Sequence, residues 1–257
     1  MNFQQVRIPL GTGESLVADW LPSKAGDAGR VTVFVHGLAS DRQGEKARYF
    51  MERFAERGWG FLAMDLRSHG DTGGPLRDLT LSRSLEDLSA SLTWLAGQRG
   101  TEAPPPVLMG SSMGGAIIAW HHLRHPRASG PLIMIAPALS FPSRLFWGLT
   151  PEELQQWRET GVRAFPSDWT PLELGFSLAE DAANYPMATL LRSYSAPTLI
   201  FHGMKDTSVS WRGSQSFLED CPCPALDLVL IKAGDHRMTA HKALIFETLW
   251  QWLADQG

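Results

Sequence analysis

The stretch VLMGSSMGGAII, residues 107–118, decides the fold of this chain. It is an apolar run that stops at a turn of small residues and resumes with apolar residues at helical spacing, which predicts a buried strand, a tight turn and a helix. The turn GSSMG matches G-x-S-x-G, in which a serine occupies a strained strand-to-helix turn and the glycines allow close packing. Only Ser112 has glycines at both required offsets, so we expect it to be a nucleophile.

The position of this serine matters for its chemistry. A serine hydroxyl is a poor nucleophile until it is held beside a base, clear of its own backbone, at the positive end of a helix. A match of three specified positions in five also arises by chance in ordinary chains. The rest of the sequence has to decide between the two interpretations.

Length and composition describe an ordinary globular protein. The 257 residues carry 44% hydrophobic and 19% charged residues with a net charge of -4, which is compatible with a single α/β domain over residues 1–257. No basic patch indicates nucleic-acid binding, and no run approaches the roughly 18 apolar residues of a membrane span. The N-terminus lacks the layout of a signal peptide. We therefore expect a cytoplasmic protein without nucleic-acid partners or stable membrane insertion.

The two cysteines give no sign of a disulfide framework or a metal site. Cys221 and Cys223 are one residue apart, which is too close for an unstrained bridge, and no second pair is available for zinc. We expect free thiols in a loop. We expect neither a metal nor an organic cofactor.

Strand-like and helix-like segments alternate along most of the chain. Residues 4–8 and 15–20 read as a hairpin, and further strands are expected at 31–35, 59–64, 107–111, 131–135, 197–201 and 226–231. Helices are expected at 43–57, 84–98, 113–125 and 240–253. This alternation predicts an open, mostly parallel sheet with helices on both faces.

The segment from about 138 to 195 departs from that alternation. It contains no strand-like run, and aromatic residues are scattered among prolines and short helix-like pieces. So long an insertion after a strand predicts a helical lid over the edge of the sheet where ligands bind. Its aromatic side chains can either pack within the lid or contact substrate: Trp147, Trp157, Phe165, Trp169, Phe176 and Tyr185.

An acid and a base follow the serine in the order that this kind of site requires. Asp206 comes just after the strand expected at 197–201, and His236 follows the strand expected at 226–231. As a general base His236 would contribute roughly 10²- to 10⁴-fold to the rate, and Asp206 would hold its ring and stabilise the imidazolium. Asp235 adjoins His236 in sequence, but neighbouring side chains rarely meet head-on, so we interpret it as a turn residue.

Acyl transfer also needs donors for an oxyanion. We expect these to be the backbone N–H groups of Met113, directly after the nucleophile, and of Leu38, in the loop after the strand at 31–35. His36 and Gly37 would shape that loop. Loss of one such donor costs roughly 10²- to 10³-fold in rate.

The remaining histidines have simpler explanations. Four lie on or beside helices, where packing or solvent is expected, and two lie in turns, where a backbone hydrogen bond is expected. The first group is His121, His122, His125 and His241, and the second is His69 and His202.

With these residues in place the chain resembles the α/β-hydrolase family over essentially its whole length. The motifs HG at 36–37, D-x-R-x-HG at 65–70, the GSSMG turn, G-x-x-D at 203–206 and DH at 235–236 occur in the family's order. More narrowly, GSSMGG, HGMKD and DHRM are similar to the palmitoyl-protein thioesterase and acyl-glucuronide esterase type and its bacterial relatives.

That resemblance implies hydrolysis of an ester or thioester with Ser112, Asp206 and His236 as the catalytic triad. The substrate would be a small acyl ester or thioester, or an S-acylated protein. The chain starts almost at its first expected strand, so we expect no transit segment and a cytoplasmic location.

Two alternative functions stay open at the level of sequence. A cofactor-free haloperoxidase or a carbon–carbon bond hydrolase would use the same three residues. The second alternative is a non-catalytic ligand-binding member of the fold. The intact set of three residues argues against it.

Overall fold

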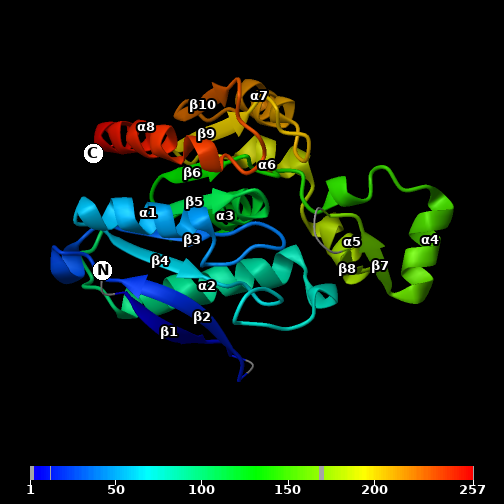
Figure 1. Ribbon diagram of the computed structural model, residues 1–257, viewed down its shortest axis with the longest axis horizontal. Helices are drawn as coiled ribbons and strands as arrows, with labels where there is room; N and C mark the ends of the chain where they lie inside the picture. The colour runs from blue at the N-terminus through cyan, green and yellow to red at the C-terminus, as the bar shows by residue number, and fades with distance from the viewer. Residues whose placement is uncertain (1–2, 12, 168–170, 257) are drawn as a thin grey trace.

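A computed structural model describes residues 3–11, 13–167 and 171–256. Eight strands form one sheet in the order β1-β2-β4-β3-β5-β6-β9-β10 (Figure 1). The pairs β1–β2 and β2–β4 are antiparallel, and all other neighbours in the sheet are parallel. The expected mostly parallel sheet is therefore confirmed. The strands are β1 (Gln4–Pro9), β2 (Ser15–Leu21), β3 (Val31–Val35), β4 (Gly60–Met64), β5 (Val107–Ser111), β6 (Leu132–Ile135), β9 (Thr198–Gly203) and β10 (Leu226–Ile231).

Helices cover both faces of the sheet (Figure 1). Helices α1 and α8 contact each other on one face, and α2 and α3 contact each other on the other. The helices are α1 (Glu45–Glu56), α2 (Leu81–Gly97), α3 (Met113–Arg124), α4 (Pro151–Thr160), α5 (Ser177–Asp181), α6 (Met187–Ser193), α7 (Trp211–Asp220) and α8 (Lys242–Asp255). Short 3₁₀ turns lie at Gly26–Ala28, Leu76–Asp78, Ser143–Leu145, Ala182–Asn184 and Thr239–His241.

The central strands are apolar throughout because each buries both of its faces. Along β3, Val33 and Val35 join the core beneath α2 and α3, while Phe34 between them joins the core beneath α1 and α8. The strands β4, β5, β6 and β9 divide their side chains in the same alternating way. Two-sided burial of parallel strands explains why their sequences read as continuous apolar runs rather than alternating ones.

The insertion between β6 and β9 differs from its expected structure. It contains helices, but it also contains an antiparallel pair of strands, β7 (Val162–Phe165) and β8 (Leu172–Gly175). The expectation of no strand in this segment was wrong. Each strand has four residues, and those of β7 are only half-buried or exposed, so they leave no apolar run in the sequence.

Four aromatic residues of the insertion pack around one of them, Trp157. Trp157 on α4 is fully buried, its Nε1 donates to the carbonyl oxygen of Leu174 at 2.9 Å, and the rings of Phe165 and Phe176 meet it edge-on. Trp147 is 64% exposed. Trp169 lies outside the described residues. The ring of Trp157 and those around it form an aromatic cluster within the insertion that is continuous with the core beneath α2 and α3.

The insertion is fastened to the body of the protein through α2 and α3 and lies to the right of the sheet in Figure 1. The backbone N–H and the hydroxyl of Ser82 on α2 bind the Asp181 carboxylate at 2.8 and 2.5 Å. Arg124 at the end of α3 donates to the Tyr185 hydroxyl at 3.1 Å. These contacts hold the base of the insertion against the two helices.

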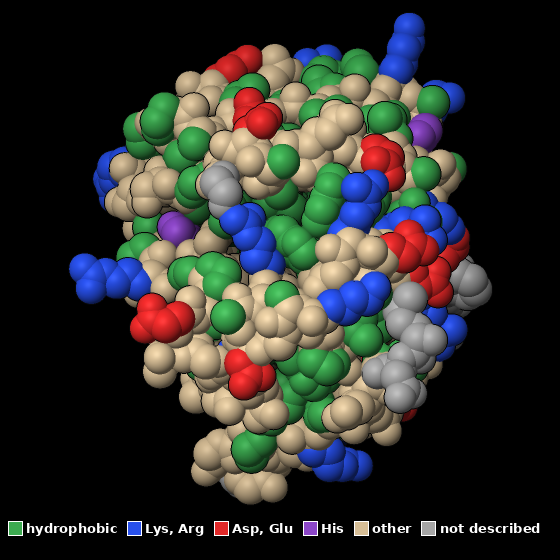
Figure 2. All heavy atoms as spheres, turned by 90° about the vertical axis from the view of Figure 1, so that its left-hand side faces the viewer, with side chains coloured by type: hydrophobic (Ala, Val, Ile, Leu, Met, Phe, Trp, Pro, Cys, Tyr) green, Lys and Arg blue, Asp and Glu red, His purple; other side chains and the backbone are tan. Residues whose placement is uncertain are grey.

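The side of the molecule opposite the insertion carries a mixed surface. Figure 2 shows apolar side chains interspersed with charged ones over this face. None of the helices in the described part of the chain is both long enough and apolar enough to cross a membrane.

Close packing at the start of α3 gives a first prediction. A Cβ at Gly114 would lie 2.1 Å from the carbonyl oxygen of Val35, so Gly114→Ala forces strand and helix apart. We expect this substitution to lower the free energy of unfolding by about 3 kcal/mol or more in urea titrations.

The matched control is Gly97→Ala at the end of α2, where an added Cβ would meet nothing within 4 Å. It should leave stability unchanged or raise it by about 0.5–1 kcal/mol. Equal stability of the two variants would contradict the packing described for the turn.

Candidate active site

Ser112 occupies a strained turn between β5 and α3. Its φ of +54° and ψ of -116° are rare for a residue with a side chain, and such backbone costs about 1–3 kcal/mol. Neighbouring strands hold it in place: its N–H donates to the Ile135 carbonyl oxygen at 2.9 Å, and its carbonyl oxygen accepts from the N–H of Ala138 at 3.0 Å. The half-buried side chain is thereby held clear of its own backbone.

The structure brings the other two residues expected at the site to this serine. Nε2 of His236 lies 3.0 Å from the Ser112 hydroxyl oxygen, and Nδ1 lies 2.7 Å from Oδ2 of Asp206. A carboxylate only accepts hydrogen bonds, which assigns the proton to Nδ1 and leaves the Nε2 lone pair facing the hydroxyl. Asp235 accepts from the N–H of Met238 at 2.8 Å, as a turn residue does.

Asp206 is held as a carboxylate by the groups around it. Its side chain is fully buried, and burial alone would raise its pKa. Hydrogen bonds from His202, His236 and the N–H of Val209 outweigh that effect and hold the pKa well below its usual range. Oδ1 accepts from the N–H groups of Ser208 at 2.9 Å and Val209 at 2.7 Å. The group is thus ionised at neutral pH.

His202 has a different role from the one expected. The expected backbone hydrogen bond is present, but His202 is the fifth residue of β9 rather than a turn residue and is fully buried. Its Nε2 lies 3.2 Å from Oδ2 of Asp206 and 3.0 Å from the Val209 carbonyl oxygen, and its Nδ1 lies 2.7 Å from the Ser214 hydroxyl. Two acceptors at Nε2 place the proton there, so His202 is a second donor to the acid.

The loop after β3 lies directly against Ser112. A Cβ at Gly37 would be 3.1 Å from the Cβ of Ser112, so only glycine lets this loop come so close. Leu38, one of the two residues expected to supply an amide, is the next residue. Met113, the other, is the first residue of α3, so its N–H has no acceptor within the helix.

His36 fixes the start of that loop. Its Nε2 accepts from the N–H of Leu66 at 3.1 Å and its Nδ1 donates to the Gly37 carbonyl oxygen at 2.8 Å. Burial lowers the pKa of His36 to about 3, with a further contribution from His69, whose ring centroid lies 4.9 Å away. The ring is therefore neutral and can accept at Nε2.

A buried arginine fixes the other end of the loop. The guanidinium of Arg42 pairs with Asp65 and contacts Asp19 at 3.1 Å and Asp71 at 2.8 Å, while its backbone N–H donates to Asp65 at 2.7 Å. Arg42 and Asp65 are both essentially inaccessible to solvent. In the sequence Asp65 is recognisable only as part of a motif, and nothing near Arg42 indicates this pairing.

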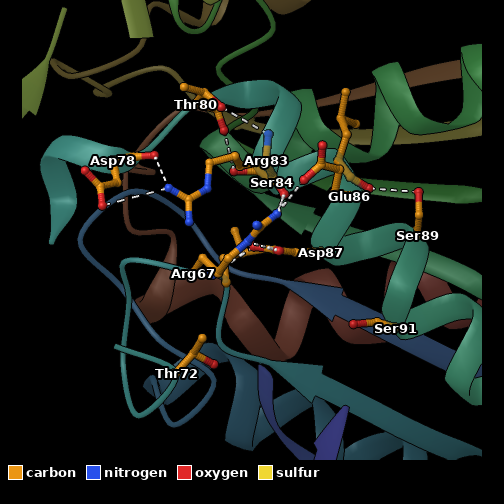
Figure 3. Close-up of polar contacts among 12 residues, drawn as sticks. Arg67, Thr72, Asp78, Thr80, Arg83, Ser84, Glu86, Asp87, Ser89 and Ser91 are labelled. Carbon is orange, nitrogen blue, oxygen red and sulfur yellow. Dashed lines mark hydrogen bonds and ion pairs between the residues drawn. The ribbon is translucent and has the colours of Figure 1, made fainter. Parts of the chain in front are cut away.

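The D-x-R-x-HG motif is tied to α2 by its arginine (Figure 3). Arg67 donates to Asp87 at 2.6 Å and to Glu86 at 2.8 Å. Burial raises the pKa of Asp87 to about 6, although the bonds from Arg67 oppose that rise. Through these contacts the motif is anchored to α2. None of its described contacts reaches Ser112.

The described residues contain no cluster of histidine, cysteine or acidic side chains that could hold a metal ion. Both cysteines are free and buried, as expected for thiols in a loop.

Comparison with known proteins places this geometry in a family. The family profile described as "Serine aminopeptidase, S33" matches residues 26–184, which include the loop after β3 and the GSSMG turn. The chain belongs to this family of α/β hydrolases. The mitochondrial palmitoyl-protein thioesterase ABHD10 of Rattus norvegicus is 26% identical over 209 residues, covering 80% of this chain and 68% of the relative.

Two further likenesses cover nearly the whole chain. A monoacylglycerol lipase of Mycolicibacterium smegmatis is 26% identical, with 94% of this chain and 93% of the relative covered. The solved structure of mouse alpha/beta hydrolase domain-containing protein 10 superposes with a TM-score of 0.84 at 23% identity, covering 99% of this chain and all of that one. The resemblance to α/β-hydrolase esterases and thioesterases is confirmed.

The buried ion cluster yields a second prediction. Arg42→Met leaves the inaccessible Asp65 carboxylate without its counter-charge, and we expect the free energy of unfolding to fall by about 3–5 kcal/mol. The control is Arg53→Met, whose pair with Glu56 is exposed, and which should change stability by less than about 0.5 kcal/mol. Urea titration of both variants measures the difference, and similar values would rule out an anchoring role for Arg42.

Proposed function

We propose that this protein is a serine hydrolase that cleaves carboxylic esters or thioesters through an acyl-Ser112 intermediate. The observation that carries the proposal is the continuous hydrogen-bond chain from the Ser112 hydroxyl through His236 to the buried Asp206. That chain starts at a serine with positive φ, next to a loop that can supply an amide. A site of this kind is defined by geometry and roles rather than by sequence position.

In the first half of the reaction His236 takes the hydroxyl proton of Ser112 at Nε2. The serine oxygen attacks the acyl carbon, and the carbonyl oxygen becomes an oxyanion that accepts from the amides of Leu38 and Met113. The ionised Asp206 stabilises the imidazolium through Nδ1. The bond to the alcohol or thiol then breaks, and the leaving group takes the proton from Nε2.

In the second half a water molecule attacks the acyl-serine. His236 accepts a proton from that water, the oxyanion forms again opposite the same amides, and collapse returns the proton to Ser112. The products are a carboxylic acid and the free enzyme. No step needs a metal ion or an organic cofactor.

The relatives' names support the choice of bond. One is a palmitoyl-protein thioesterase and another a monoacylglycerol lipase, and both names denote cleavage of an acyl ester or thioester. We propose that the substrate is a small acyl ester or thioester or an S-acylated protein. We also propose that residues 1–257 form one catalytic domain in which the insertion at about 138–195 serves as a lid, and that the protein acts in the cytoplasm.

The nucleophile is tested by Ser112→Ala. Turnover of p-nitrophenyl acetate should fall by at least about 10⁴-fold, and labelling by a fluorophosphonate should disappear, because the reacting oxygen is gone. Ser111→Ala is the matched control and should still be labelled. Turnover or labelling that survives in the Ser112→Ala variant would refute the acyl-Ser112 intermediate.

The acid is tested by Asp206→Asn. The amide would hold His236 in the wrong tautomer, and we expect kcat to fall by roughly 10³- to 10⁴-fold. Asp235→Asn removes the carboxylate adjacent to His236 in sequence, and its kcat should stay within about threefold of the wild-type value, since Asp235 serves a turn. A larger loss of kcat in Asp235→Asn than in Asp206→Asn would show that Asp235, and not Asp206, is the acid that orients His236.

A substrate panel separates the alternatives that share this triad. p-Nitrophenyl esters and acyl-coenzyme A thioesters of increasing chain length test the proposal directly. An amino-acid p-nitroanilide tests the peptidase activity that the family's description names, and peroxide with halide or a diketone tests the other two chemistries. Faster turnover of any of these last three than of every ester and thioester would overturn the proposed substrate class.

A further inference from the structure

A lysine lies behind the nucleophile in a place that the mechanism above does not use. Lys46, the second residue of α1, donates from Nζ to the Ser111 hydroxyl at 2.6 Å. Ser111 is the last residue of β5, is 4% exposed, and immediately precedes Ser112. The lysine therefore holds the strand end that directly precedes Ser112.

The surroundings of this ammonium do not neutralise it. No carboxylate in the described ranges lies within ion-pair distance of Lys46, although Asp235 and Asp206 are close enough to attract its charge. Arg237 opposes them. On its own helix, the neighbouring Glu45 is paired instead with Lys242 of α8. A half-buried ammonium that is hydrogen-bonded to a hydroxyl and lacks a carboxylate at ion-pair distance is costly to the fold.

The titration of Lys46 agrees with that description. Burial lowers its pKa to about 8, and the attraction of Asp235 and Asp206 only partly offsets this effect. The group therefore carries its charge at pH 7 and loses it as the pH rises through about 8. A folded-state pKa below the usual value means that the charged form destabilises the fold below about pH 8. Charges that a fold keeps at such a cost are concentrated at functional sites.

We propose that Lys46 is a positioning residue of the active site: through Ser111 it fixes the strand end that carries Ser112, and its positive charge supports the negative charge that develops at the turn. This inference rests on the proposed hydrolase function. The charge lies behind the nucleophile, and the amides of Leu38 and Met113 contact the oxyanion itself. When the ammonium loses its proton, the hydrogen bond to Ser111 reverses or weakens and the charge disappears, so activity declines.

The test compares Lys46→Met with wild-type enzyme in a pH series of kcat/KM for p-nitrophenyl acetate. We expect wild-type activity to decline above about pH 8 and the variant to be about tenfold less active at pH 7, with that decline absent. Lys46→Arg keeps a charge that does not titrate in this range, and it should recover activity and extend it to higher pH. Lys24→Met, at an exposed lysine, is the control and should match wild type throughout.

Stability distinguishes this role from a merely structural one. Because the charged lysine costs stability, Lys46→Met should melt at the same temperature as wild type or higher while losing activity. In Lys46→Met the Ser111 hydroxyl has lost the Lys46 donor, and the double variant Lys46→Met/Ser111→Ala removes that hydroxyl as well. The activity of the double variant should resemble that of Lys46→Met. A lower melting temperature in both variants, with activity lost in proportion to unfolded protein, would overturn the proposal.

Failure of this inference and failure of the hydrolase function give different results. Full activity and an unchanged alkaline decline in Lys46→Met would refute the role of Lys46 and leave the acyl-Ser112 mechanism intact. Wild-type protein that neither turns over any ester nor reacts with a fluorophosphonate would refute the function itself. In that case the inference about Lys46 falls with it.

Discussion

The strained backbone at Ser112 is the constraint on which the rest of the structure depends. A residue with a Cβ at φ +54° persists only if its neighbours hold it there, and the carbonyl groups and amides of β6 and the following loop do so. The next turn of chain must then pass almost in contact with β3, which Gly114 permits. β5, which ends in this turn, lies between β3 and β6 in the sheet, so both neighbouring strands bear on the turn.

Buried charge holds the loops around that turn in place. The loop after β3 is fixed at one end by a neutral histidine and at the other by Arg42, which meets three carboxylates. Asp206 is fixed by four hydrogen-bond donors, of which His236 is only one. Loops are mobile by default. Here each loop that carries a proposed catalytic group is crossed by charged hydrogen bonds, so the geometry is set before substrate arrives.

Much of this arrangement can be predicted from the sequence. The rest leaves no local sequence pattern, for physical reasons. Parallel strands buried on two faces leave long apolar runs, and the GSSMG turn and the two strand-end loops follow from local patterns, so the sheet and the three residues proposed as the triad can be predicted. The strands β7 and β8 leave no such run because they are short and partly exposed. The pairs Lys46–Ser111 and Arg42–Asp65 join residues far apart in the chain, and no local pattern records them. His202 belongs to a recognised motif, but it directly follows the strand expected at 197–201, whereas β9 extends to Gly203. His202 was therefore expected in the turn and lies in the strand.

The aromatic cluster of the insertion has a consequence for how such a protein can change. Trp157 and the rings around it contact one another, and the insertion meets the body at the 3₁₀ turn Leu76–Asp78 and at α2 and α3. In the described residues none of these contacts involves Ser112, His236 or Asp206, so substitutions at them leave the hydrogen bonds among those three residues in place. The insertion can therefore diverge in sequence without altering that hydrogen-bond chain.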